Sequence, residues 1–307
     1  MKRTEVIAAF LTLLSGAFLF TASSDTGRVR ELAPGVYYRP AEPEKRIIAN
    51  AGWVVFRDYV LVIDANFPWG AKAVLEDLRK TTKKPVKFVF DTHYHGDHAN
   101  GNSVWVDAGA TILCSEECQA ELQTKGAAAW ANSRDEGQFS LKPYRLETAQ
   151  IAFRGRLVFD DGEHRVELIR LGPGHTKGDA VAWLPKERIL FTGDLCVNSP
   201  GNNLADADAD PDNWLRALDS LRQYGVARVV PGHGGEGDAR TLDGQRAYLA
   251  DMIQGIRDGT AQGKSADDLA RGLDLSSHKP WGENAERNQV SIRAVYARLQ
   301  QLKGGTQ

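Results

Sequence analysis

The sequence predicts an α/β fold in which two mixed β-sheets pack face to face and helices flank them, an αββα sandwich. Segments typical of strands occur in both halves of the chain, and segments with a helical apolar period follow each group of strands. The 307 residues, 42% of them hydrophobic and 25% charged, can bury one large core or two modest ones. The chain has no internal repeat or low-complexity run, and we expect a single domain over residues 24–303.

The first half of the chain predicts strands at Gly52–Arg57 and Val60–Asp64, which are rich in β-branched residues and flank a tight turn at Asp58-Tyr59. Apolar residues at helical spacing predict a helix over Ala71–Lys80. The other elements expected in this half are a buried strand at Val86–Asp91, a helix near Gly101–Val106, a strand at Ala110–Leu113 and a helix from the N-cap Ser115 to about Gln123.

The second half of the chain predicts two hairpins followed by helices. The first hairpin pairs Leu157–Asp160 with Arg165–Leu171 around Asp161-Gly162, and the second pairs Ala180–Leu184 with Ile189–Thr192. Helices are expected at Asp212–Tyr224, Ala239–Arg257 and Arg287–Leu302, with a strand at Arg228–Val230 after the first.

The first 23 residues are typical of a secretory signal peptide. Lys2 and Arg3 precede an apolar stretch from Val6 to Phe20, and Thr21-Ala22-Ser23 offers small residues for cleavage. The stretch is short for a bilayer-spanning helix, and an uncleaved anchor is the alternative. We expect an exported protein, periplasmic or secreted, with no stable membrane association after processing. The formal charge of −2, with no block of like charges, predicts no nucleic-acid partner.

Five of the seven histidines lie in short segments that also hold two aspartates suited to metal binding. The densest segment, Asp91–His98, reads H-x-H-x-D-H. Neutral imidazole suits zinc, and three such ligands leave a fourth position open to water. His93 and His95 are two residues apart and point the same way in an extended segment. The seven candidate metal ligands are His93, His95, Asp97, His98, His175, Asp194 and His233.

The order of these motifs resembles the metallo-β-lactamase superfamily from about Asn50 to about Arg240. An aspartate ends an apolar strand at Asp64, and H-x-H-x-D-H, G-H-T, G-D and P-G-H-G follow in turn. The resemblance implies two Zn²⁺ ions per chain. One ion would be held by His93, His95 and His175, the other by Asp97, His98 and His233, with Asp194 bridging. Asp64 would support the metal loop without binding an ion.

The resemblance and the ligand chemistry predict a zinc-dependent hydrolase that acts on a small ester, lactone, thioester or amide. Two zinc ions lower the pKa of a shared water toward about 7, which provides a hydroxide nucleophile at neutral pH. Asp97 and Asp194 would orient this hydroxide, and Asp97 could pass a proton to the leaving atom.

The segment from Pro200 to Asp208 resembles the loop that carries a polarising asparagine in zinc β-lactamases of the B1 type. Asn202 and Asn203 are therefore candidate catalytic residues. Two departures weaken this likeness: Asp194 stands where those enzymes carry cysteine, and Val197 stands where they carry a basic residue that grips the β-lactam carboxylate. We therefore expect β-lactam hydrolysis to be weak or incidental.

Two alternatives belong to other classes of protein. The chain also resembles the iron-dependent persulfide dioxygenases, which use the same scaffold with a single iron, and metal analysis would separate the two. A non-catalytic zinc-binding protein is the other alternative, and it would require an obstructed coordination site.

Other polar residues are expected to have structural roles. Cys114 and Cys118 are spaced poorly for a bridge, and three buried thiols are predicted at these positions and Cys196. His164 and His278 are predicted to face solvent. Trp69, Trp130 and Phe139 are expected in loops, packed or lining a substrate cleft. A polar loop at Asp206, Asp208 and Asp210 is expected to lead into the next helix.

Overall fold

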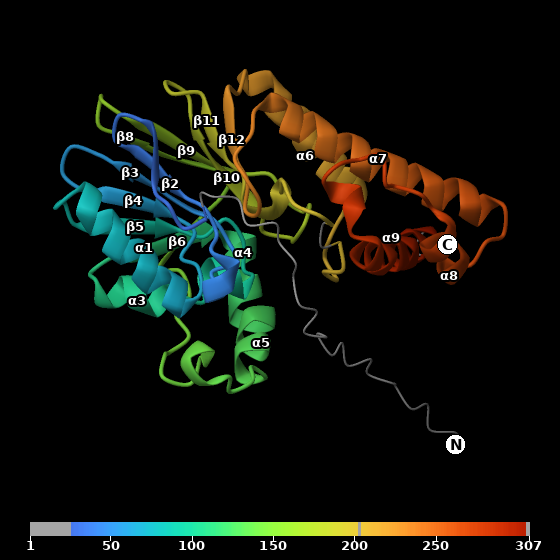
Figure 1. Ribbon diagram of the computed structural model, residues 1–307, viewed down its shortest axis with the longest axis horizontal. Helices are drawn as coiled ribbons and strands as arrows, with labels where there is room; N and C mark the ends of the chain where they lie inside the picture. Colours follow the sequence, from blue (N-terminus) through green and yellow to red (C-terminus); the bar gives the residue numbers. More distant parts are fainter. Residues whose placement is uncertain (1–25, 202–203, 305–307) are drawn as a thin grey trace.

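The computed structural model describes residues 26–201 and 204–304, which form two β-sheets packed against each other with helices outside (Figure 1). The first sheet has seven strands in the order β1-β2-β3-β4-β5-β6-β7, and the second has five in the order β12-β11-β10-β9-β8. Both sheets mix parallel and antiparallel pairs. The predicted αββα sandwich is confirmed.

The first half of the chain builds the seven-stranded sheet and its helices. Strand β4 pairs with β3 in an antiparallel hairpin and with β5 in parallel. The strands are β1 (Arg30–Ala33), β2 (Val36–Arg39), β3 (Ala51–Val55), β4 (Val60–Ile63), β5 (Val86–Phe90), β6 (Thr111–Ser115) and β7 (Ile151–Phe153). The helices are α1 (Pro68–Thr81), α2 (Gly96–Ala99), α3 (Asn102–Asp107), α4 (Glu116–Glu121) and α5 (Ala127–Ala131), with a π-helical turn at Leu122–Gly126 between the last two and short 3-10 turns at Pro43–Lys45 and Gly137–Phe139.

The second half builds the five-stranded sheet and a group of helices beyond it. Its strands are β8 (Arg156–Asp160), β9 (Arg165–Arg170), β10 (Ala180–Leu184), β11 (Ile189–Phe191) and β12 (Arg228–Val230). Its helices are α6 (Pro211–Leu221), α7 (Ala239–Ala261), α8 (Ala266–Gly272) and α9 (Ala285–Gly304), with 3-10 turns at Gly193–Leu195, Arg222–Tyr224 and Trp281–Glu283. Helices α7, α8 and α9 contact one another at one end of the molecule (Figure 1).

Alternation along the strands divides the core into three layers. In β4, Leu61 and Ile63 point into the layer between the sheets, where they meet residues of the second sheet such as Phe191. Val60 and Val62 point to the opposite face, which α1 and α3 cover (Figure 1). The outer face of the second sheet packs against α6 and α7 in the third layer. Both sheets are thus covered on both faces, and the chemistry is left to the loops at their ends.

Several predicted elements differ from the structure. Helix α1 begins at Pro68, so Trp69 lies in a helix and not in a loop, and Trp130 likewise lies in α5. The helix expected to end near Gln123 continues through the π-helical turn into α5. The sequence reading missed the short strands β1, β2 and β7 and the helix α8.

The prediction that His164 faces solvent is wrong. The residue is buried at 5% exposure, and its Nδ1 lies 2.8 Å from Glu187 Oε1. His278 is half-buried, with its Nε2 2.8 Å from Asp251 Oδ2. Both rings were expected in solvent because they adjoin polar turns, whereas carboxylates distant in sequence meet them in the fold.

The described residues include no helix with the length and apolar character needed to span a membrane. The predicted signal peptide, residues 1–23, lies outside the described residues and stays a prediction.

Candidate metal centre

The seven candidate ligands converge at one edge of the sandwich because each follows the end of a strand. The H-x-H-x-D-H segment follows β5, His175 lies between β9 and β10, Asp194 follows β11 and His233 follows β12. Strands β11 and β12 are parallel neighbours, so Asp194 and His233 emerge at the same edge of the second sheet. Sites in mixed and parallel sheets form at such strand ends.

Three histidines form the first ligand group. One ring nitrogen from each of His93, His95 and His175 lies within 4.8 Å of the others. His95 Nδ1 and His175 Nε2 are 2.9 Å apart. His93 and His175 are buried, and His95 is partly exposed. This is the set that the resemblance implies for one ion.

The second group joins Asp97, His98 and His233, whose ligand atoms also lie within 4.8 Å of one another. His233 Nε2 is 3.2 Å from Asp97 Oδ2. Asp194 stands between the two groups. Its Oδ1 lies 3.2 Å from His233 Nε2 and 3.3 Å from His98 Nε2, and its Oδ2 lies 3.6 Å from His175 Nε2. The two oxygens of this carboxylate therefore face different groups.

Partners on the far side of the rings fix which nitrogen faces the centre. Asp64 Oδ2 lies 2.9 Å from His98 Nδ1, and Asp64 Oδ1 accepts a 2.9 Å hydrogen bond from the Thr92 backbone N–H. His233 Nδ1 donates to the Ile48 carbonyl at 2.8 Å. In the neutral form that binds a metal, each Nδ1 thus carries the proton and each Nε2 keeps its lone pair toward the centre. Asp64 supports the loop, as the resemblance implies.

Electrostatics in the metal-free chain are dominated by close packing of these groups. Burial, with His98 and His95 nearby, lowers the pKa of His93 well below its usual value. Burial opposes charge on His98 and His233 too, but the aspartates outweigh it and raise the pKa of both, that of His233 to about 10. Burial likewise opposes ionisation of Asp97 and Asp194, yet the imidazoles hold the pKa of both carboxyls well below the usual range.

The residues fit a metal centre on three observations. His93 Nε2 is fully buried without a hydrogen-bond partner among the described residues. The facing nitrogens of His95 and His175 need a proton or a cation between them. The donor set of imidazoles and carboxylates suits zinc and related transition metals.

A network that sequence reasoning missed supports His95 from behind. Asp206, expected in a plain polar loop, has its Oδ2 3.5 Å from His95 Nε2. The same carboxylate accepts hydrogen bonds from the Tyr94 hydroxyl and, at 2.7 Å, from Lys125 Nζ. Lys125 lies on the π-helical turn, a type of irregularity often found at functional sites. The alternating aspartates Asp206, Asp208 and Asp210 mark this loop in the sequence, but the sequence does not show that Asp206 meets His95.

The network extends to the loop that carries His175. Glu121 accepts from Lys125 Nζ at 3.2 Å and from the Gly178 backbone N–H at 3.0 Å. Lys125 Nζ is also 2.8 Å from Asp208 Oδ2, so one ammonium serves three carboxylates. The cation is therefore neutralised within the protein.

Half-buried aromatic rings lie close to the H-x-H-x-D-H loop. Phe67 stacks on Trp69 at 4.8 Å between ring centroids, and Trp69 meets Phe139 edge-on at 5.4 Å. A side chain at Gly96 would come within 3.3 Å of the Phe67 ring, which places this ring next to the metal loop. Of the aromatic residues proposed from sequence for a cleft, Trp69 and Phe139 share this group.

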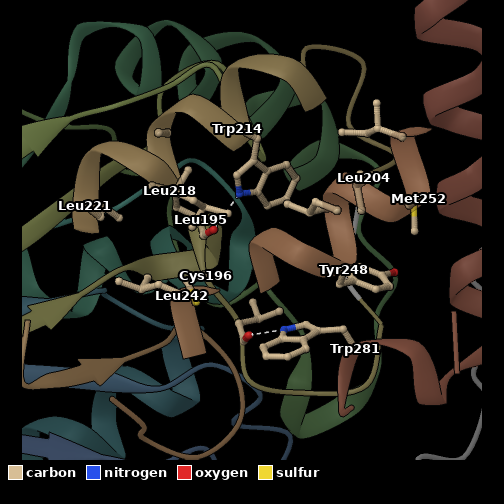
Figure 2. Packing of buried hydrophobic residues seen from close by; sticks show 14 of the residues in the cluster. Leu195, Cys196, Leu204, Trp214, Leu218, Leu221, Leu242, Tyr248, Met252 and Trp281 are labelled. Carbon is tan, nitrogen blue, oxygen red and sulfur yellow. Dashed lines mark hydrogen bonds between the residues drawn. The ribbon is translucent and has the colours of Figure 1, made fainter. Parts of the chain in front are cut away.

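The remaining candidates fall into two classes. The three thiols are buried and unpaired, as predicted, and Cys196 packs in the apolar layer of α6 and α7 (Figure 2). No cysteine belongs to a ligand group within the described part of the chain. Asn202 and Asn203 lie outside the described residues, so their catalytic roles stay predictions.

Comparison with known proteins identifies the family. The family model for the metallo-beta-lactamase superfamily matches residues 45–233. The metallo-beta-lactamase type 2 of Bacillus cereus is 31% identical over 211 residues, 68% of this chain and 73% of that protein. The metallo-beta-lactamase IND-1 of Chryseobacterium indologenes is 26% identical over 195 residues, 62% of this chain and 73% of that protein.

Solved structures show the same architecture. A metallo-beta-lactamase from Pontibacter korlensis matches with a TM-score of 0.57 at 25% identity, over 72% of this chain and 98% of that one. The DIM-1 metallo-beta-lactamase matches in fold with a TM-score of 0.59 at 21% identity, over 73% of this chain and 96% of that one.

An αββα sandwich with imidazoles and carboxylates gathered at one edge defines a class of metal-dependent hydrolases. The chain belongs to the metallo-β-lactamase superfamily. It is a metal-dependent hydrolase, and the family that its sequence motifs resemble is confirmed.

Proposed function

We propose that the protein is a dinuclear zinc hydrolase for a small neutral ester, lactone, thioester or amide. The observation that carries the proposal is the placement of Asp194, whose two oxygens face different ligand groups. Seven ligands exceed the need of one tetrahedral ion, and a carboxylate shared between two groups can hold two ions close together, as in two-metal hydrolases.

The candidate ligands would have different roles in the reaction. His93, His95 and His175 would hold one zinc ion, and Asp97, His98 and His233 the other. When bound, zinc acts as a Lewis acid and supplies an activated water at neutral pH. Asp97 and Asp194 would offer carboxylate oxygens to orient this water, and Asp97 would accept its proton and deliver it to the leaving atom.

Charge around the centre supports a neutral substrate. Val197, three residues after Asp194, is 2% exposed and packs in the apolar layer with Trp214, so its side chain does not face the centre. Lys125 is bound by three carboxylates. The aromatic group of Phe67, Trp69 and Phe139 next to the metal loop supports an apolar portion in the substrate.

The test combines metal analysis with a substrate screen. Protein purified without chelator should carry two zinc ions per chain by elemental analysis. Initial rates on ester, lactone and thioester probes should exceed those on β-lactams and should vanish after chelation. A stable value of one ion per chain, with His98 and His233 replaceable at no cost, would contradict the dinuclear centre.

A second candidate function is β-lactam hydrolysis, favoured by the 31% identity to the Bacillus cereus metallo-beta-lactamase. A missing charge-assisted hydrogen bond to the substrate carboxylate costs about 1.5–3 kcal/mol, or about 10- to 150-fold in affinity. We therefore expect weak turnover of penicillins, cephalosporins and carbapenems. A kcat/KM above about 10⁵ M⁻¹s⁻¹ on any of them would make this candidate the main function.

A further inference from the structure

Two of the side chains that bind the segment after the bridging carboxylate come from outside the region that matches the family. Residues 195–198 run from Asp194 toward the loop of His233, and the match to the family model ends at residue 233. Helix α7 and the turn Trp281–Glu283 come after that point and still contact this segment (Figure 2).

Three buried donors bind two carbonyls of the segment. The Leu195 carbonyl accepts from Trp214 Nε1 at 2.7 Å and from Gln245 Nε2 at 3.0 Å. The Val197 carbonyl accepts from Trp281 Nε1 at 2.6 Å (Figure 2). The Val197 N–H donates to Gln245 Oε1 at 2.7 Å. Gln245 is fully buried and Trp281 is 5% exposed, so loss of either leaves buried backbone groups without a partner.

The same segment is attached to two candidate ligands. Asp194 immediately precedes Leu195 within the 3-10 turn Gly193–Leu195. At the other end, the Asn198 N–H donates to the His233 carbonyl at 2.8 Å, and Asn198 Nδ2 donates to the Gly235 carbonyl at 2.9 Å. A shift of this backbone would therefore move the bridging carboxylate and His233 together.

The indole ring of Trp281 is itself held in position by its neighbours. The ring lies over Gly244, where a Cβ would come within 2.5 Å of the indole. The Gly282 carbonyl next to it accepts from Asn288 Nδ2 at 3.0 Å, and Asn288 Oδ1 accepts from the Tyr248 hydroxyl at 2.7 Å. Helices α7 and α9 thus hold the indole in place, and a rigid support is what precise ligand placement needs.

We propose that Gln245 and Trp281 are positioning residues for the metal centre, acting through residues 195–198 on Asp194 and His233. The C-terminal helices would thereby set the geometry of His233 and of the bridging carboxylate, and would act on the group of His93, His95 and His175 through Asp194 alone. The inference rests on the proposed function in that it concerns the metal bound by the second group.

The test compares Trp281→Phe with Trp53→Phe as a matched control. Trp53 is also fully buried, and its indole donates to Thr81 Oγ1 at 3.1 Å on the far side of the first sheet. Both variants lose one buried N–H donor, but only Trp281 contacts the segment after Asp194. Gln245→Met is a second variant that keeps the side-chain length and loses both hydrogen bonds.

Stepwise zinc affinity, from competition with a chromophoric chelator, and Co²⁺ absorption spectra are the readouts. We expect Trp281→Phe and Gln245→Met to weaken binding of the lower-affinity ion about tenfold and to alter its cobalt spectrum. Residues that hold metal ligands typically contribute about 10- to 100-fold in affinity, and these two act through the backbone. Trp53→Phe should lower the melting temperature and leave both readouts unchanged.

Hydrogen exchange of the metal-free protein provides a readout that does not depend on the number of ions. The Val197 and Asn198 amides should exchange faster in Gln245→Met than in the wild type or the control. Equal affinities, spectra and exchange in the variants and the control would overturn the inference whatever the ion count. A wild-type protein that binds one ion would instead contradict the proposed dinuclear function.

Discussion

Replacing Asp64 by asparagine should separate the orientation of His98 from the stability of the fold. Asp64 has a φ of 66°, in the left-handed region that Asn and Asp tolerate better than other side chains. The amide oxygen of asparagine can still accept from the Thr92 N–H. Its NH₂ group would then face His98 Nδ1, where the aspartate oxygen lies 2.9 Å away. Two donors cannot face each other, so Nδ1 must accept and the ring proton moves to Nε2.

A proton on Nε2 blocks the lone pair that His98 would offer to a metal. Loss of such a partner lowers metal affinity about 10- to 100-fold, equivalent to about 1.4–2.7 kcal/mol. Asp64→Ala should also lose folding stability, by about 1–3 kcal/mol, because the buried Thr92 N–H is left without a partner. Asp64→Asn should therefore lower the metal affinity more than the folding stability, and Asp64→Ala should lower both.

The assay is stepwise zinc affinity beside the free energy of unfolding of the metal-free protein. Asp251→Asn is the matched control, because Asp251 pairs with His278 at 2.8 Å and this histidine belongs to no ligand group among the described residues. Asp64→Asn that keeps wild-type affinity for every ion would refute the assigned role of Asp64.

Three further predictions concern the same centre. Asp194→Ala should keep the fold yet lose at least one metal and most of the activity; full metal content and turnover would contradict the bridging role. Asp206→Ala should weaken the ion of the three-histidine group about 10- to 100-fold, measured by chelator competition, and Asp206→Asn, which keeps an acceptor for His95 Nε2, should lose less. The raised pKa of His233, about 10 against its usual 6.5, stabilises the metal-free fold fully below pH 6.5, and this contribution is lost as the pH rises through 10. Urea titrations of the metal-free proteins should show a smaller loss in His233→Ala, which keeps only the contribution of His98, than in the wild type, and a parallel pH dependence in both would contradict the prediction.

The elements predicted from sequence are those with a strong apolar pattern. The hairpin of β3 and β4 was predicted from its β-branched residues and its turn, and the structure has it. Strand β7 was missed because three residues at a sheet edge, two of them exposed, carry no periodic signal. Helix α1 starts three residues before its predicted start because Pro68 favours the first helical position without contributing to the apolar period.

The candidate ligands could be found from sequence because their local spacing reflects strand ends. The residues that hold them could not be found this way. Asp206 meets His95 across 111 positions of sequence, and Trp281 meets Val197 across 84. Such contacts depend on how the sheets and helices pack, which no local pattern records. The contact of Glu187 with His164 also depends on packing between distant segments, which is why the prediction of an exposed ring was wrong.

The arrangement of charge around the centre links the fold to the choice of substrate. Asp97 and Asp194 bring negative charge to the ligand groups themselves, and the ammonium of Lys125 is balanced by three carboxylates. At Val197 the backbone turns the side chain into the layer packed by α6 and α7, because Gln245 and Trp281 bind both of its peptide groups. A basic residue there would be buried, not presented to a substrate carboxylate. Because the same contacts turn this side chain away from the centre, position 197 offers no cation to a substrate carboxylate, and this supports our proposal of a neutral carbonyl compound as the substrate.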